Sequence, residues 1–262
     1  MTSNASGLLD DTVTLVAGVG PGLGGHIARH AVAAGGKVML GARTGDLGRA
    51  LVEELGEASS HFAPLDVTDP ETCQRWVDVA AERFGRADAL VVNAMAARSG
   101  TLVGGEIDDW RHAMEVNLFG ALQVSRAAVP VLSRSPAPSI VFIGSQIVRR
   151  VFPGRGPYAA SKAALMTAAQ VMALELGPLG VRVNTMLPGR MWGAPLRSAA
   201  ARLAAERGRS EDEEIQTWID ATALRRLATD EECARVVTFL NSHLAASITG
   251  QTIDANAGET MR

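Results

Sequence analysis

The feature that most constrains the fold of this chain is a regular alternation of short apolar runs with longer amphipathic segments. The short runs are rich in Val, Leu and Ile, which is typical of strands buried on both faces of a sheet. The longer segments place apolar residues at helical spacing, as Leu23, Ile27 and Ala31 do in the first of them. Such alternation forms right-handed βαβ units, so the sequence predicts an α/β protein with a doubly wound parallel sheet of about seven strands and helices on both faces.

The alternation also gives approximate bounds for the elements. The predicted strands are Thr12–Ala17, Lys37–Ala42, His61–Leu65, Ala87–Asn93, Ser139–Ile143, Val181–Leu187 and Thr252–Ala255. The predicted helices are Leu23–Ala34, Gly45–Gly56, one that Pro70 opens, Asp108–Leu132 and Tyr158–Leu176.

No linker-like change in composition divides the chain, so we predict a single domain over residues 1–262. The one irregular stretch is residues 189–224, between the last two strands, with an Ala/Arg-rich piece (Ser198–Arg209) and an acidic piece (Glu211–Glu214). We expect this stretch to cover a substrate site at the carboxyl ends of the strands, and the acidic piece to be a solvated face.

Composition and charge argue against several classes of protein. A net charge of -3 without a basic stripe makes nucleic acid a poor partner. No apolar run could span a bilayer and Met1–Asp11 does not resemble a signal peptide, so we expect a cytoplasmic protein without membrane contact. Cys73 and Cys233 lie in expected helices and are interpreted as reduced apolar residues. His26 and His30 have a metal-ligand spacing but no adjacent third ligand, so we expect a partly solvated helix face and no metal.

A glycine-rich turn joins the first predicted strand to the first helix. Such a turn lets the backbone approach a pyrophosphate, which the amide groups at the helix N-terminus then bind. Two registers fit: Gly20, Gly22 and Gly25 match G-x-G-x-x-G, while Gly18, Gly22 and Gly24 match G-x-x-x-G-x-G. The position of the turn predicts a Rossmann-type nucleotide site.

The end of the second predicted strand favours NADP(H) over NAD(H). NAD-binding chains place an acid there to accept both ribose hydroxyl groups, whereas this chain has Ala42 followed by Arg43. The Arg43 guanidinium can bind the 2′-phosphate of NADP, and Asp46 lies too far along the chain to bind the ribose. The alternative is that Arg43 is only a solvated charge and the protein also uses NAD(H).

Tyr158 and Lys162 lie four residues apart at the start of a predicted helix, on one face. A phenol is a poor base at neutral pH, but a nearby ammonium group lowers its pKa and makes it a usable general acid or base. Ser145 follows the fifth predicted strand and could bind a substrate oxygen beside this phenol. Asn117 lies inside a predicted helix, where holding an ordered water near Lys162 would explain it.

In its ordered set of motifs the chain resembles the classical short-chain dehydrogenase/reductase family from Val13 to Gly258. The resemblance implies catalytic roles for Asn117, Ser145, Tyr158 and Lys162, with Asn117 holding a relay water and Lys162 also binding the nicotinamide ribose. With the residues argued above, the expected cofactor contacts are Gly18, Gly20, Gly22, Leu23, Gly24, Arg43, Asp66, Val67, Asn93, Ala94, Tyr158, Lys162, Pro188 and Gly189. The resemblance also implies a homotetramer, or a homodimer, built on the two longest helices.

The chain departs from the family pattern in three places. Ala17 replaces a Thr, and Met95 replaces a Gly near the nicotinamide. The segment Arg190-Met191-Trp192, which follows Pro188-Gly189, lacks the usual Thr.

The expected substrate pocket consists of Met95, Gln146, Phe152 and Trp192. With Ile147, Val148 and Met191 nearby, it favours an apolar and bulky carbonyl compound. Phe152 and Trp192 could equally fill core. The Arg149-Arg150 pair is interpreted as a solvated pair, although it could meet an anionic substrate.

The sequence therefore predicts an oxidoreductase that moves a hydride between NADP(H) and a secondary alcohol/ketone pair. The alternatives are an NAD-dependent alcohol dehydrogenase of the same fold and a nucleotide-binding scaffold without turnover. A lyase or epimerase is less favoured, because those relatives have larger C-terminal substrate regions. An esterase is disfavoured because Gly144-Ser145-Gln146-Ile147 lacks the second glycine of a nucleophile elbow.

Overall fold

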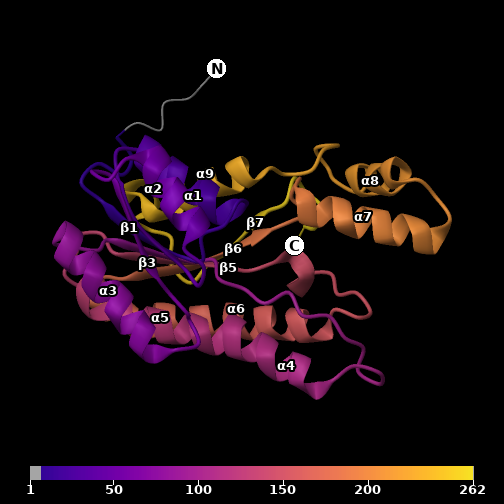
Figure 1. Ribbon diagram of the computed structural model, residues 1–262, viewed down its shortest axis with the longest axis horizontal. Helices are drawn as coiled ribbons and strands as arrows, with labels where there is room; N and C mark the ends of the chain where they lie inside the picture. The colour runs from indigo at the N-terminus through magenta and orange to yellow at the C-terminus, as the bar shows by residue number, and fades with distance from the viewer. Residues whose placement is uncertain (1–6, 262) are drawn as a thin grey trace.

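A computed structural model describes residues 7–261 of the chain, without the side chains of residues 194 and 195. Seven parallel strands form one sheet in the order β3-β2-β1-β4-β5-β6-β7 (Figure 1). The strands are β1 (Val13–Ala17), β2 (Lys37–Ala42), β3 (Ser60–Pro64), β4 (Ala89–Val92), β5 (Ser139–Ile143), β6 (Arg182–Pro188) and β7 (Thr252–Ala255). The predicted fold class is confirmed, and each predicted strand is present within two residues at either end.

Helices cover both faces of this sheet (Figure 1). One face carries α1 (Leu23–Ala33), α2 (Asp46–Leu55) and α9 (Asp230–Asn241). The other carries α3 (Pro70–Phe84), α4 (Ile107–Met114), α5 (Ala121–Leu132) and α6 (Gly156–Leu176). Two further helices, α7 (Ala194–Arg207) and α8 (Glu211–Asp220), extend beyond the sheet near the end of β6.

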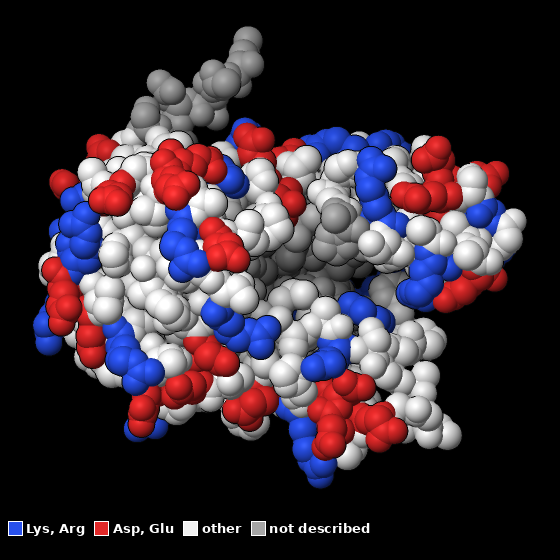
Figure 2. All heavy atoms as spheres, viewed as in Figure 1, with Lys and Arg blue, Asp and Glu red and all other residues white. Residues whose placement is uncertain are grey.

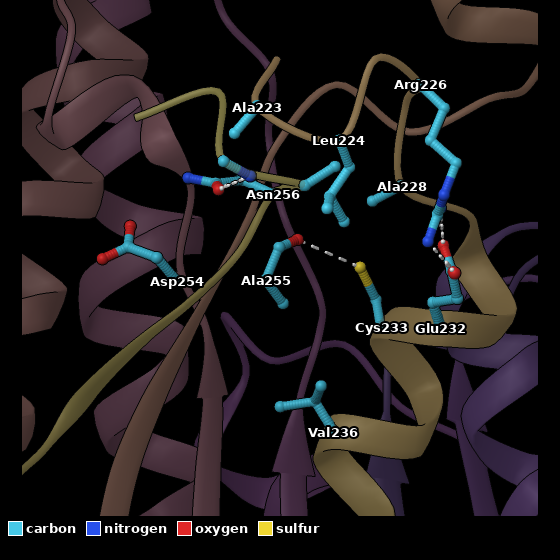
Figure 3. A pocket seen from close by; sticks show the side chains of 12 residues that line it. Ala223, Leu224, Arg226, Ala228, Glu232, Cys233, Val236, Asp254, Ala255 and Asn256 are labelled. Carbon is cyan, nitrogen blue, oxygen red and sulfur yellow. Dashed lines mark hydrogen bonds and ion pairs between the residues drawn. The ribbon is translucent and has the colours of Figure 1, made fainter. Parts of the chain in front are cut away.

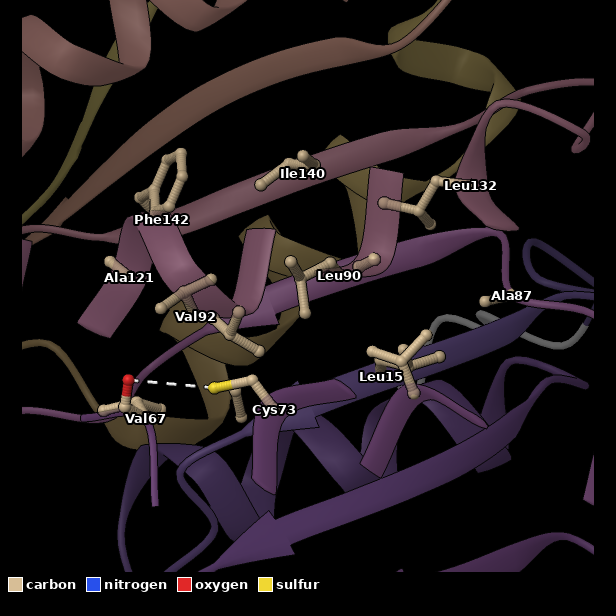
Figure 4. Packing of buried hydrophobic residues seen from close by; sticks show 14 of the residues in the cluster. Leu15, Val67, Cys73, Ala87, Leu90, Val92, Ala121, Leu132, Ile140 and Phe142 are labelled. Atoms are coloured by element: carbon tan, nitrogen blue, oxygen red, sulfur yellow. Dashed lines mark hydrogen bonds between the residues drawn. The ribbon is translucent and has the colours of Figure 1, made fainter. Parts of the chain in front are cut away.

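Large apolar side chains fill the layer between the sheet and α3, α5 and α6 (Figure 4). Trp76 packs so closely on Gly41 that a Cβ there would lie 2.8 Å from the indole ring, and its indole N–H donates to the Leu40 carbonyl at 3.1 Å. Cys73 and Cys233 are buried free thiols, and burial raises their pKa values to about 11 and about 12. Both are therefore unreactive apolar residues, as the sequence predicted.

The long helix expected over Asp108–Leu132 is interrupted. A π-helical turn over Glu115–Gly120 separates α4 from α5 and contains Asn117. Gly120 in this turn lies against Val67, which a Cβ would approach to 2.7 Å. Helical periodicity cannot reveal a single wider turn, because the apolar face continues through it.

The expectation of an irregular stretch over residues 189–224 is wrong, because most of it forms α7 and α8. These two helices share a small core of their own with Leu196, Ile215 and Trp218. The acidic piece is not a solvated face throughout, since Glu214 is fully buried and pairs with Arg207 and Arg209 at 2.7 and 3.1 Å. Ser210 begins α8 with a capping box, a signal that the sequence carried.

Within residues 7–261, no helix is long and apolar enough to cross a membrane. The same part of the chain contains no group of three or more potential metal ligands, and His30 lies 3.8 Å from Glu231. The segment Met1–Asp11, expected not to be a signal peptide, lies partly outside the described residues.

Candidate active site

The glycine turn brings the end of β1 against the end of β4. Gly18 has a φ of +102°, and a Cβ on it would lie 2.4 Å from the Ala94 amide nitrogen. The Asn93 side-chain amide donates to the Gly18 carbonyl at 2.6 Å, and the Asn93 and Ala94 backbone amides both donate to Ala17 at 2.8 Å. The turn therefore lies where the strand order reverses between β1 and β4, which is where sheets of this type bind nucleotides.

The space around the glycines favours the G-x-x-x-G-x-G register, in which two of the three positions, Gly18 and Gly24, leave no room for a Cβ. A Cβ on Gly24 would lie 2.4 Å from the Gly18 carbonyl oxygen, so both of these positions need glycine. Gly25 is also tight, at 2.6 Å from the Gly20 carbonyl oxygen, whereas Gly20 itself has open space and Gly22 meets only ordinary contacts. The open side at Gly20, at the N-terminus of α1, gives room for a phosphate to approach the backbone.

Residues at the carboxyl ends of β2 and β3 lie on the opposite side of β1 from β4. Asp66 follows β3 and accepts hydrogen bonds from the Thr68 amide and hydroxyl at 3.0 and 2.7 Å. These bonds hold the pKa of Asp66 below its usual value, and the nearby Arg43 guanidinium adds to the effect. Arg43 is exposed at the end of β2, whereas Val67 is buried in the core.

Tyr158 and Lys162 lie on the first turns of α6, beneath the end of β5. Both are buried, and the Lys162 ammonium donates to the Ile143 carbonyl at 2.7 Å. It lies 5.9 Å from the centre of the Tyr158 ring. Burial lowers the pKa of Lys162 to about 8, because the apolar surroundings disfavour its charge.

The Tyr158 hydroxyl contacts the Met95 sulfur at 3.9 Å, so Met95, which departs from the family pattern, lies directly against the phenol. Burial raises the pKa of Tyr158, while a hydrogen bond with Ser145 and the charge of Arg155 lower it in part. This direction is opposite to the lowering expected from the sequence. Ser145 also accepts from the Ile147 amide at 3.2 Å, which fixes its hydroxyl near the phenol.

The Asn117 side chain joins the segment after β4 to α6. Its oxygen accepts from the Ala96 amide at 2.7 Å, and its amide group donates to the Ala96 carbonyl at 3.0 Å and to the Ser161 hydroxyl at 2.8 Å. Both side-chain donors are thus used within the protein. These hydrogen bonds explain the asparagine at position 117 without the expected water. A water bound to Asn117 would have to donate to one of its oxygen atoms.

A buried carboxylate, Glu259, holds together two loops near the end of the sheet. It accepts from the Gln146 side-chain amide at 2.6 Å and from the Arg190 backbone amide at 3.1 Å, and it forms an ion pair with the Arg190 guanidinium. Gln146 follows Ser145, and Arg190 follows Pro188-Gly189. A Cβ on Gly189 would lie 2.7 Å from the Asn256 side chain, so this loop packs tightly on the C-terminal segment.

The remaining residues near the expected substrate pocket differ in their burial and contacts. Phe152 packs in one small apolar cluster with Tyr158 and Ile147. Trp192 is 42% exposed, with Arg197 5.1 Å above its ring, so it does not fill core. Arg149 pairs with Asp254 at 3.2 Å and is largely buried, so the interpretation of a solvated pair is wrong for this residue.

The face shown in Figure 2 is hollowed between the body of the molecule and the α7–α8 segment, and Lys and Arg side chains border this hollow. A separate pocket of about 410 Å³ lies between α9 and the segment after β7 (Figure 3). Cys233 there donates to the Ala255 carbonyl at 3.5 Å, and an Arg226–Glu232 pair lies beside it. None of the predicted catalytic residues lines this second pocket.

Most predicted site residues thus lie along the carboxyl edge of the sheet, as parallel strands require. Three residues beside the site were not predicted from the sequence to be part of it: Arg155, Arg190 and Glu259. Arg155, the residue just before α6, precedes Tyr158 by only three positions, which is a readable signal. Glu259 had none, because its partners lie far away in the sequence.

Comparison with known proteins agrees with this geometry. The family model described as "Enoyl-(Acyl carrier protein) reductase" matches residues 18–260. The chain is 30% identical to trans-4-hydroxycyclohexanecarboxylate dehydrogenase of Sinomonas cyclohexanicum, covering 98% of this chain and 96% of that one. It is also 30% identical to the 3-oxoacyl-[acyl-carrier-protein] reductase FabG of Escherichia coli, over 95% and 97% of the two chains.

The fold is likewise shared with a solved enzyme. The ligand-free aldohexose dehydrogenase of Thermoplasma acidophilum superposes with a TM-score of 0.85 at 29% identity, covering 98% of this chain and 97% of that one. The chain therefore belongs to the classical short-chain dehydrogenase/reductase family, whose members are oxidoreductases that use nicotinamide cofactors.

The burial of Lys162 predicts an unusual dependence of stability on pH. The unfolded chain keeps the Lys162 proton up to about pH 10.5 and the folded chain only up to about pH 8, so stability rises with pH between these values. Lys162→Met removes this effect. We expect the variant to gain stability relative to the wild type at pH 7, by up to roughly 3 kcal/mol, with the difference shrinking by pH 9.5.

Urea unfolding at several pH values measures this difference, and Lys37→Met, at an exposed lysine of β2, is the matched control. A stability difference between Lys162→Met and the wild type that stays constant from pH 7 to 9.5 would contradict the assigned pKa of Lys162.

Proposed function

We propose that this protein is an oxidoreductase that transfers a hydride between NADP(H) and a secondary alcohol or ketone, with Tyr158 as the general acid/base. The observation that carries the proposal is the arrangement of the buried Tyr158 and Lys162 with the half-buried Ser145 at the carboxyl end of β5. The chemistry that the cofactor supplies is acceptance or donation of a hydride at the nicotinamide ring. The residues of the chain hold the substrate and move its proton.

In the oxidative direction Tyr158 accepts the proton of the substrate hydroxyl as the hydride leaves the carbinol carbon. In the reductive direction it returns that proton to the forming alkoxide. Ser145, whose hydroxyl lies beside the phenol, orients the substrate oxygen. Burial raises the pKa of Tyr158, and the Ser145 hydrogen bond and the Arg155 charge lower it in part. The Lys162 ammonium, 5.9 Å from the centre of the phenol ring, would add its charge in favour of the phenolate.

The residues present suit a dinucleotide. The cradle at Gly18 and Gly24, which a Cβ would fill, lets a pyrophosphate lie near the backbone at the start of α1. The exposed Arg43 at the end of β2 is free of any carboxylate within 4 Å among residues 7–261, and so is available to a 2′-phosphate. The remaining proposed contacts are Leu23, Asp66, Val67, Asn93, Ala94, Pro188 and Gly189.

An enzyme is favoured over a nucleotide-binding scaffold, because a scaffold would not need a lysine whose burial lowers its pKa to about 8. We further propose a single domain in which the α7–α8 segment covers the substrate, and a protein that works in the cytoplasm. The nearby apolar cluster of Ile147, Val148 and Phe152 suits a bulky carbonyl compound.

Tyr158→Phe tests the acid/base assignment. The variant keeps the ring and so binds cofactor, but it has no transferable proton, and turnover should fall by roughly two to four orders of magnitude. The measurement is nicotinamide absorbance with a panel of ketones that includes 4-oxocyclohexanecarboxylate, the oxidised form of the alcohol named for the Sinomonas relative. Turnover within a few-fold of the wild type would rule out Tyr158 as the acid/base.

Arg43→Ala and Ala42→Asp test the choice of cofactor. A charge-assisted contact to the 2′-phosphate corresponds to a preference of roughly ten- to a hundredfold for NADP(H). Arg43→Ala should raise the KM for NADPH much more than that for NADH, and Ala42→Asp should shift the preference towards NADH. Arg49→Ala, at an exposed arginine of α2, is the control. Equal use of both cofactors by the wild type would show that Arg43 does not recognise the phosphate.

A homotetramer, or a homodimer, is proposed through the face formed by α5 and α6. Large apolar side chains are exposed on α6 and on the π-helical turn, with Phe119 and Val171 at 48% and Leu174 at 81%. Burial of such side chains against a second copy would stabilise the assembly. Light scattering at micromolar concentration should give a mass of two or four chains, and a mass of one chain would refute the assembly.

A further inference from the structure

Three arginine side chains lie over the two aromatic rings next to the proposed catalytic centre. The Arg155 guanidinium lies 5.2 Å from the centre of the Tyr158 ring. Those of Arg150 and Arg190 each lie 5.5 Å from the centre of the Phe152 ring. Phe152 and Tyr158 belong to the same small apolar cluster, so the three positive charges border one site.

The positive charge of this group is only partly balanced. Glu259 pairs with Arg190, but neither Arg150 nor Arg155 has a carboxylate within 4 Å among residues 7–261. Arg155 donates to the Ser99 hydroxyl at 2.9 Å, which positions it without neutralising it. Burial lowers the pKa of Arg190, and the charge of Arg150 lowers it further, because two cations repel one another.

Stacking on an aromatic ring also restricts the orientation of each guanidinium group. A guanidinium held over a ring keeps its N–H donors in the plane of the fork, free to bind a planar anion with two hydrogen bonds. Arg155 lies within one helical turn of Tyr158, so an anion bound there would place a carbonyl of the same small molecule near the phenol.

We propose that the substrate carries a carboxylate group, which Arg150 and Arg155 bind while the carbonyl or hydroxyl carbon lies against Tyr158 and Ser145. The apolar part of the substrate packs on Phe152 and Ile147. Arg190 is occupied by Glu259 and contributes charge rather than direct contacts. This inference rests on the proposed function and names the substrate class of that same site.

The test compares two ketones that differ only in charge, 4-oxocyclohexanecarboxylate and 4-oxocyclohexanecarboxamide, with NADPH. For the wild type we expect a KM at least about tenfold lower for the carboxylate. The double variant Arg150→Gln/Arg155→Gln should bring the ratio of the two KM values close to one. This ratio cancels any effect common to both ketones, such as that of the Arg155 charge on Tyr158. Arg150→Lys/Arg155→Lys, which keeps both charges, should restore part of the preference.

Arg75→Gln, at an exposed arginine of α3, is the control for loss of one positive charge. Equal KM values for the two ketones in the wild type would overturn the proposal, as would a double variant that loses both ketones alike. If no ketone in the panel is reduced, the proposed function fails. Calorimetry then decides the carboxylate site separately: carboxylate binding that the double variant loses supports it, and equal binding of carboxylate and carboxamide overturns it.

Discussion

The burial of the Lys162 ammonium group is the constraint on which the rest of the site depends. Its one hydrogen-bond partner in the described part of the chain is the Ile143 carbonyl, so the charge is held in apolar surroundings that lower its pKa to about 8. Such a group persists only if α6 is fixed firmly against the end of β5, and Leu165 and Ala169 of the same helix do this by packing into the core. A buried charge that lowers the stability of the folded protein is typical of a catalytic site.

Hydrogen bonds from other buried side chains hold the neighbouring loops along the same edge of the sheet. Asn117 joins α6 to the segment after β4 through Ser161 and Ala96, and that segment packs on Gly18 of the glycine turn. Glu259 joins the loops that follow β5 and β6. In both cases a buried polar side chain holds a loop through hydrogen bonds to a distant segment.

Much of this architecture could be predicted from the sequence, because it depends on short-range patterns. Strand and helix periodicity placed the sheet, and the run of glycines between the first strand and the first helix placed the turn. The tight approaches at Gly18 and Gly24 leave no room for a side chain. The parts that could not be predicted depend on distant residues. Periodicity gives no sign of the π-helical turn at Asn117, of the partners of Glu259, or of the burial of Glu214 between α7 and α8. The direction of the Tyr158 pKa was also missed, because proximity to Lys162 is visible in the sequence whereas the degree of burial is not.

The most direct test of this account uses the fact that Tyr158 is the only tyrosine of the chain. The ultraviolet absorbance change on formation of tyrosinate therefore reports the pKa of this one residue, in the free protein and with NADP⁺ bound. The account predicts a pKa above the ordinary value of 10 in the free protein, because burial disfavours the phenolate. It predicts that NADP⁺ lowers this pKa, because the nicotinamide brings a positive charge close to the phenol. A pKa that does not change on binding NADP⁺ would contradict the role of Tyr158 as the acid/base of hydride transfer.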